Sequence, residues 1–146
     1  MSNVRRALAQ THHVRDHCLC LHAQRAARAL ARRFDEALRP VDLTNGQFSL
    51  LTSLSRPAPP TLGGVAGLLV MDRTTLTAAL KPLVRRGLVK IAADQDDRRS
   101  RRLSITPAGR ALLAKAFPLW KREHAAAECR IPGSADALRA ALRALS

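Results

Sequence analysis

Aromatic side chains are scarce in this 146-residue chain, which has three Phe, one Trp and no Tyr. Proteins that bind single-stranded nucleic acids stack the bases on aromatic side chains, so this composition disfavours that class.

No apolar run approaches the ~20 residues of a membrane-spanning helix, and the start, Met1 to Arg6, lacks the apolar core of a signal peptide. We therefore expect a cytoplasmic protein with no membrane partner. The three cysteines, an odd number, do not suggest a disulfide framework.

Acidic residues are also scarce. The chain has 25 Lys and Arg against 11 Asp and Glu, which gives a formal net charge of +14 at pH 7. Such a balance indicates a polyanionic partner, either a nucleic acid or an anionic membrane surface. Because single-strand binding is disfavoured, duplex DNA, which proteins bind through phosphates and groove edges, is the leading candidate. The length suits one domain with its own core.

Capping residues and apolar spacing predict that most of the chain is helical. A long helix from Thr11 to about Leu38, ended by Pro40, carries one apolar stripe that needs a partner surface, which we expect another copy of the chain to supply. Later helices are predicted to begin after Thr44, Thr61, Asp72, Thr106 and Ser134. Two of them contain prolines, Pro82 and Pro118, which should kink them.

Residues 88–92 and 102–105 are predicted to form the strands of a hairpin with a strongly basic loop. The loop contains Arg98, Arg99 and Arg101. An arginine that enters a narrow minor groove gains from the negative potential there, and the carboxylate of Asp97 can pair with the Arg99 guanidinium and fix its direction. An isolated charge run of this kind is more often a solvated hairpin with no partner. After a capped helix that ends at Gly87, the order of elements favours a DNA-binding wing.

The helix after Asp72 is the candidate for the major groove, because the first turns of a recognition helix contact base edges. Those turns contain Arg73, Thr74, Thr75 and Thr77, with Lys81 one turn further on. Arginine can bind guanine through two hydrogen bonds, and threonine can donate to a base or phosphate or contact a thymine methyl group. The N-terminus of the helix also favours a nearby phosphate.

Several motifs occur in the order that is typical of one known family. They are Leu43–Phe48, Met71–Thr77, Arg86–Val89, Asp97–Arg99 and Leu103–Gly109. Together they resemble the MarR family of transcriptional regulators over nearly the whole chain. The resemblance implies a mainly α-helical winged helix-turn-helix with a small two- or three-stranded β-wing, N- and C-terminal dimerisation helices, and a working pair of Asp97 and Arg99 in the wing. Many members have arginine at the position of Ala78, so base readout is expected to depend more on Arg73, Thr75 and Thr77.

The resemblance also implies an assembly and a function. Residues 1–43 and 107–146 are expected to supply helices that interleave in a homodimer, and residues 44–106 are expected to form the DNA-binding lobe. The implied function is sequence-specific binding of a pseudo-palindromic operator in double-stranded DNA by a repressor that a small ligand releases, with no enzymatic activity and no cofactor. A non-specific architectural DNA-binding protein is the alternative that the net charge alone supports.

The family's usual effector is a small, often aromatic or anionic ligand held between the dimerisation helices and the winged lobe. The resemblance makes His22, Arg28 and Arg32 candidate lining residues of such a ligand pocket. The other interpretation is that these side chains form a solvated basic face.

The segment His17–His22 contains two cysteines, Cys18 and Cys20, which lie about 200° apart on a helix and should face opposite ways. Leu19–Leu21, followed by Arg28 and Ala29, resembles the first helix of the organic-peroxide-sensing OhrR branch of the family. This implies an alternative function as a peroxide-sensing repressor, with a reactive Cys20, a resolving Cys129 from the other subunit and Cys18 as a further thiol. The simpler interpretation is that a helical cysteine is a small apolar residue.

Metal binding and enzymatic thiol chemistry are both disfavoured. His13, His17 and Cys20 share one face of the predicted helix but span roughly 11 Å, too far to meet one ion. No metal site is therefore expected. A thiol peroxidase around Cys20 would need a base and an orienting group at recognisable spacing, and the sequence has no such set.

Overall fold

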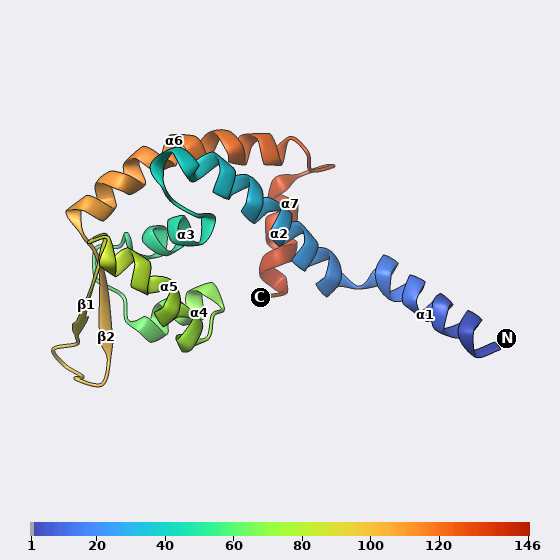
Figure 1. The fold of residues 1–146 in the computed structure, drawn as a ribbon, viewed down its shortest axis with the longest axis horizontal. Coiled ribbons are helices and arrows are strands. Elements are labelled where there is room, and N and C mark those ends of the chain that lie inside the picture. The colour runs from blue at the N-terminus through green and yellow to red at the C-terminus, as the bar shows by residue number, and fades with distance from the viewer. Residues whose placement is uncertain (1) are drawn as a thin grey trace.

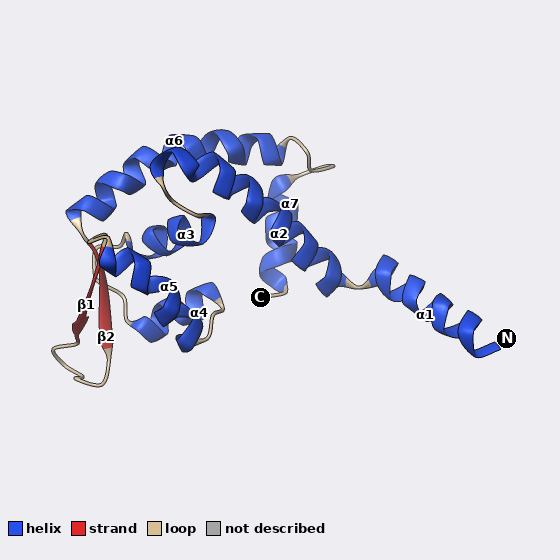
Figure 2. Ribbon diagram, viewed as in Figure 1, coloured by secondary structure: helices blue, strands red, loops and turns tan. Residues whose placement is uncertain are grey.

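The structure, a computed structural model, describes residues 2–146 as a largely helical chain with one β-hairpin (Figures 1 and 2). The elements are α1 (Ser2–His17), α2 (Leu19–Leu38), the 3₁₀ turn η1 (Arg39–Val41), α3 (Asn45–Leu54), α4 (Leu62–Leu69), α5 (Arg73–Arg85), β1 (Val89–Ala93), β2 (Arg101–Ile105), α6 (Pro107–Glu128) and α7 (Ala135–Ala144). Helices α2 and α6 pack side by side above α3, α4, α5 and the hairpin (Figure 1). The predicted winged helix-turn-helix is confirmed.

Five helices, α3, α4, α5, α6 and α7, begin where the capping residues predicted. A side-chain oxygen of each capping residue accepts a hydrogen bond from the backbone N–H three residues later, in Thr44, Thr61, Asp72, Thr106 and Ser134. Thr44 and Gln47 form a complete capping box at the start of α3. Gly87, with φ of 69°, follows the end of α5, as the sequence predicted. Helices α5 and α6 continue through their prolines.

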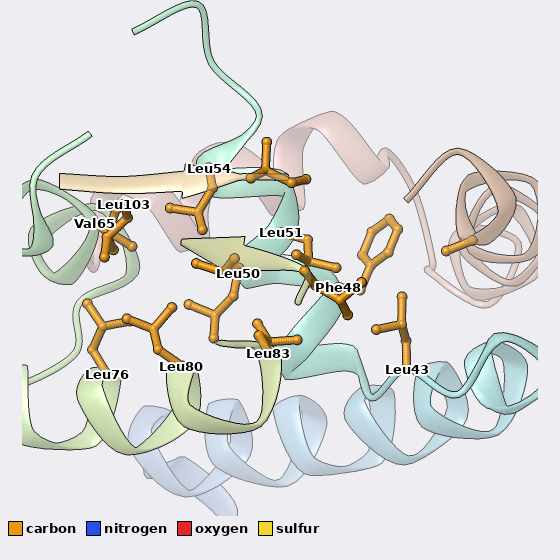
Figure 3. Close-up of a cluster of buried hydrophobic side chains, with 14 of the residues drawn as sticks. Leu43, Phe48, Leu50, Leu51, Leu54, Val65, Leu76, Leu80, Leu83 and Leu103 are labelled. Atoms are coloured by element: carbon orange, nitrogen blue, oxygen red, sulfur yellow. The ribbon is translucent and has the colours of Figure 1, made fainter. Parts of the chain in front are cut away.

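Leucines of α3, α5 and β2 fill the core of the winged lobe (Figure 3). The fully buried side chains include Leu51 and Leu54 of α3, Val65 of α4, Leu76, Leu80 and Leu83 of α5, and Leu103 of β2. The three α5 leucines share one face of the helix because they lie four and three residues apart. Burying that face against α3 and the hairpin leaves the opposite face of α5 to solvent.

The hairpin is antiparallel and is attached to the helices at its base. Val89 pairs with Ile105 and Ala93 with Arg101, one residue from the predicted bounds. Thr61 forms a β-bridge with Arg102, and the Leu103 N–H donates to the Pro60 carbonyl at 2.9 Å, so a third chain segment pairs with the two strands.

Gly109 fixes the distance between α6 and the hairpin. A Cβ at this position would lie 2.3 Å from the Leu88 carbonyl oxygen and 2.8 Å from Ile105 Cγ1. Such contacts are far inside van der Waals separation, so a side chain would force the first turn of α6 away from β1.

The prediction of one long helix from Thr11 to Leu38 is wrong. The chain leaves helical geometry at Cys18 (φ −74°, ψ 107°), whose Sγ accepts the Leu21 N–H at 3.4 Å and caps α2. Thr11 lies inside α1, and its hydroxyl donates to the Ala7 carbonyl. The predicted apolar stripe begins only at Leu19, and residues 11–17 have a single apolar side chain, Val14, so the periodicity could not detect the break. The expected 200° separation of Cys18 from Cys20 assumed an intact helix and does not apply.

Several apolar side chains remain exposed on the terminal helices. Helix α1 projects away from the rest of the chain (Figure 1), with Val4, Leu8 and Val14 exposed. On α2 the predicted apolar stripe is buried at Phe34 and Leu38 but exposed at Leu19 and Leu30. Helix α7 exposes Leu138 and Leu142. Within residues 2–146, no helix combines the length and apolar character needed to span a bilayer.

Candidate nucleic-acid interface

A tight turn positions α5 relative to α4. Val70 ends α4 in the left-handed conformation (φ 51°, ψ 46°), and Asp72 then caps α5. One Asp72 oxygen accepts the Thr75 N–H at 2.8 Å, and the other accepts the Thr75 hydroxyl at 2.6 Å. The Thr75 hydroxyl, together with the backbone N–H groups, keeps the pKa of Asp72 below its ordinary value. The carboxylate is therefore charged at neutral pH and holds the first turn of α5 together.

The predicted DNA-contacting residues of α5 all lie on its exposed face. They are Arg73, Thr74, Thr75, Thr77 and Lys81. Their hydroxyl groups differ in availability, because the Thr77 hydroxyl donates to the Arg73 carbonyl at 2.7 Å, whereas the Thr74 hydroxyl has no hydrogen-bond partner within residues 2–146. The guanidinium of Arg73 lies against Gly63 of α4, where an added Cβ would be 3.1 Å from Nη2. Arg73 is thus directed along α4.

A buried carboxylate organises the base of the wing loop. Asp94 is 5% exposed and accepts the N–H groups of Asp96 at 2.8 Å and Asp97 at 3.3 Å. Its second oxygen pairs with the Arg102 guanidinium, which also donates to the Pro59 carbonyl at 3.0 Å. The Asp96 N–H and the Arg102 guanidinium hold the pKa of Asp94 below its usual range. The wing is thereby attached to the loop before α4.

Arg102 and Asp94 therefore have a role that the sequence did not reveal. The Arg102 side chain is engaged with Asp94 and with the Pro59 carbonyl. Three acidic residues crowd positions 94–97, and their spacing does not indicate which of them is buried beside the strand.

The tip of the wing leaves its arginines without intrachain charge partners. Asp97 accepts the backbone N–H of Arg99 at 3.0 Å, rather than the guanidinium that the sequence suggested. The Ser100 N–H donates to the Asp97 carbonyl, and the Asp94 N–H donates to the Ser100 carbonyl, which closes the loop. Within residues 2–146, no ion pair involves Arg98, Arg99 or Arg101, and all three are exposed. The wing thus presents a fixed backbone with guanidinium groups open to an anion.

The residues suggested for a ligand pocket lie together on α2. His22, Arg28 and Arg32 line a shallow hollow of about 500 Å³ along this helix, with Arg25 beside them. A second hollow of about 440 Å³ lies between α2, α6 and α7 and is mainly apolar, with Leu30, Phe34, Ile131, Leu138 and Leu142 in its lining. The hollow on α2 is basic, so the two differ in the ligand or partner that they suit.

The cysteines differ in exposure. All three are free thiols; Cys18 is half-buried, whereas Cys20 and Cys129 are exposed. Gln24 donates to the Cys20 Sγ at 3.2 Å. His13 and His17 stack with ring centroids 4.3 Å apart, but no group of three or more potential metal ligands gathers in the part of the chain that the structure describes.

Comparisons with known proteins agree with this architecture. A family model described as the MarR family matches residues 43–100. The regulator MosR of M. tuberculosis, solved in complex with DNA, is 39% identical, with a TM-score of 0.80 over 88% of this chain and 92% of that chain. The repressor CouR, solved bound to a 23-mer DNA duplex, is 30% identical, with a TM-score of 0.78 over 90% of this chain and 94% of that chain.

Curated relatives match over a smaller share of the chain than these solved structures do. The transcriptional activatory protein BadR of Rhodopseudomonas palustris is 33% identical over 87 residues, which are 58% of this chain. The matched stretch spans only 50% of the BadR chain. An uncharacterised regulator of Bacillus subtilis, YybA, matches at 29% identity over 66% of this chain and 62% of its own length.

Proposed function

Because the chain belongs to the MarR family of transcriptional regulators, which are not enzymes, we propose that it binds a pseudo-palindromic operator in double-stranded DNA as a homodimer. The observation that carries the proposal is the unpaired set of wing arginines beside an exposed α5. The contacts we propose on α5 are Arg73, Thr74, Thr75, Thr77 and Lys81, and those on the wing are Arg98, Arg99 and Arg101, with Asp97 fixing the loop. The relatives solved with DNA, MosR and CouR, support this use of the fold.

The test is a selection from a pool of random duplexes, followed by affinity measurements at physiological salt. Arg99→Ala is expected to weaken operator binding roughly ten-fold or more, because a fixed cationic contact is lost. Arg122→Ala is the matched control, since this exposed arginine of α6 carries the same charge outside the winged lobe. Equal losses in both variants, or equal affinity for operator and unrelated duplexes, would support a non-specific architectural protein instead.

Dimerisation is proposed from the terminal helices. Residues 1–43 and 107–146 are the proposed dimerisation segments, and residues 44–106 are the proposed DNA-binding lobe. The exposed apolar side chains of α1, α2 and α7 support this division, because a monomer would leave them in water. Two recognition helices should then sit about 34–36 Å apart, one turn of duplex. Sedimentation should give twice the chain mass, and Leu142→Glu should reduce it to the chain mass.

A repressor released by a small ligand is the proposed mode of regulation. The basic hollow of His22, Arg28 and Arg32 suits a carboxylate, because guanidinium groups bind carboxylates through paired hydrogen bonds. Transcription from a promoter that overlaps the operator should fall when the protein is added and recover with an aromatic carboxylate. Arg28→Ala should reduce that recovery. Activation by the protein would instead resemble BadR, a transcriptional activatory protein.

Peroxide sensing is the second candidate, favoured by the exposure of the Cys20 and Cys129 thiols. A hydroperoxide would take two electrons and two protons from the two thiols, leaving a disulfide, an alcohol and water. The expected product is a Cys20–Cys129 linked dimer on a non-reducing gel, with weakened operator binding. Cys18→Ser should leave that dimer intact. Unchanged DNA affinity after oxidation would exclude this candidate.

A further inference from the structure

The outer face of α5 has fewer free polar groups than its sequence indicates. Its exposed residues include Thr75, Thr77 and Ala78, and two of these have hydroxyl groups that could read bases. We propose that Thr77 and Ala78 read thymine, by packing their methyl groups against the 5-methyl group of the base. This inference rests on the proposed DNA-binding function and names the base class that α5 selects.

The Thr77 hydroxyl is already engaged. It donates to the Arg73 carbonyl one turn earlier at 2.7 Å, a geometry that threonine commonly adopts in helices. Its single hydrogen is used in that bond, so the group has no proton to donate to a base acceptor. The other branch of the side chain is the methyl group, and the residue is exposed.

Thr75 is engaged in the same way. Its hydroxyl donates to Asp72 at 2.6 Å and completes the cap of α5. Donating this hydroxyl proton to DNA would leave the Asp72 carboxylate with the Thr75 backbone N–H alone. Any contact of Thr75 with DNA is therefore made without donating its hydroxyl proton, whereas Thr74 retains an available hydroxyl for a polar contact.

Ala78 adds a second exposed methyl side chain to α5, one residue after Thr77. It is exposed on α5, whose opposite face carries the buried Leu76, Leu80 and Leu83 (Figure 3). A methyl side chain at this place cannot hydrogen-bond to a base edge. The thymine C5-methyl is the apolar group that base pairs display in the major groove, so it is the group that this surface fits.

The cations of α5 do not compete for this role. The Arg73 guanidinium lies against Gly63 on α4, and the first helix of a helix-turn-helix crosses the phosphate backbone. Lys81 is a flexible point charge that suits a phosphate better than a planar base edge. Arg73 and Lys81 thus set the position of the helix, and the methyl surface discriminates between bases.

The first experiment removes the thymine methyl groups one at a time. In the selected operator, each thymine is replaced by deoxyuridine, which keeps every hydrogen-bonding group and deletes only the 5-methyl. At one or two positions in each half-site, we expect affinity to fall about four-fold, the effect of uncovering one methyl group. The other thymines should be insensitive.

The second experiment identifies the protein side of that contact. Thr77→Ser keeps the hydroxyl and deletes the methyl, and it should abolish the deoxyuridine penalty at one position. Thr77→Val keeps a methyl and deletes the hydroxyl, and it should retain the penalty. Thr52→Ser is the matched control, because Thr52 on α3 is also exposed and also bonds to a carbonyl one turn earlier, at 2.8 Å. It should leave the penalty unchanged.

The possible outcomes distinguish failure of the thymine-methyl contact from failure of the proposed DNA binding. If no sequence is enriched from the random pool, the proposed operator binding fails. If an operator is obtained but deoxyuridine has no effect at any position, or if Thr77→Val removes the penalty and Thr77→Ser retains it, the methyl contact is refuted and DNA binding stands.

Discussion

The backbone of Val70 determines how α5 leaves α4, and it can be tested by replacement. Val70 has φ of 51°, and its side chain is 76% exposed. The left-handed conformation costs a non-glycine residue about 1–3 kcal/mol, because the Cβ atom crowds the following carbonyl oxygen. Glycine has no Cβ and adopts this conformation without that cost.

We expect Val70→Gly to be more stable than Val70→Ala by about 1 kcal/mol. Both variants lose the two γ-methyl groups, and because Val70 is exposed, the further loss of Cβ in glycine removes little apolar contact. The released strain exceeds the ~0.4–1 kcal/mol that the glycine variant loses through the greater freedom of its unfolded chain. At Ala114, an exposed residue inside α6, the order should reverse, with Ala114→Gly less stable than the wild type by about 1 kcal/mol.

Guanidinium denaturation of the four proteins measures both differences, provided that the m-values agree. The test uses the sign of the stability difference between glycine and alanine, which should be opposite at positions 70 and 114. It does not depend on the absolute stability of any variant. A Val70→Gly variant that is less stable than Val70→Ala would refute the left-handed conformation at this turn.

Three further changes test the core and the wing. Leu80→Ala should lower the free energy of unfolding by about 3 kcal/mol through the cavity it leaves, measured by guanidinium denaturation, because Leu80 is 1% exposed. Gly109→Ala should destabilise by about 1–3 kcal/mol, seen as a lower melting temperature, because its Cβ would meet the Leu88 carbonyl. Asp94→Asn should be less stable than wild type at neutral pH. Because the folded pKa of Asp94 is lowered, this difference should persist above about pH 4 and shrink as the pH falls further, and a constant difference would contradict it.

The sequence predicted the starts of α3, α4, α5, α6 and α7 correctly because a helix cap is a local pattern. A capping side chain bonds a backbone N–H three residues away, as Thr44 and Asp72 do. Leucines three and four residues apart, such as Leu76 and Leu80, occupy one face of any helix. The order of these elements and the surplus of basic charge were enough to indicate a winged DNA-binding lobe.

The same reasoning failed where a local pattern permits more than one structure. The apolar stripe of the predicted long helix begins only at Leu19, so it could not show that the backbone leaves the helix at Cys18. In the wing, the spacing of Asp97 and Arg99 suggested a side-chain ion pair, whereas the carboxylate bonds the backbone of Arg99. In both places a hydrogen bond to the chain's own backbone replaced the contact that spacing suggested.

By itself, the sequence determined the helical lobe with its basic hairpin, because capping, periodic burial and net charge act between near neighbours or over the whole chain. Only the tertiary structure decided which polar groups remain available to DNA. Asp94 forms an ion pair with Arg102, which also donates to the Pro59 carbonyl. Arg73 lies against Gly63. These contacts form because folding brings separate segments of the chain together. Those contacts engage some charged side chains within the protein and leave others free to bind DNA. No pattern of neighbouring residues indicates which charged side chains are engaged.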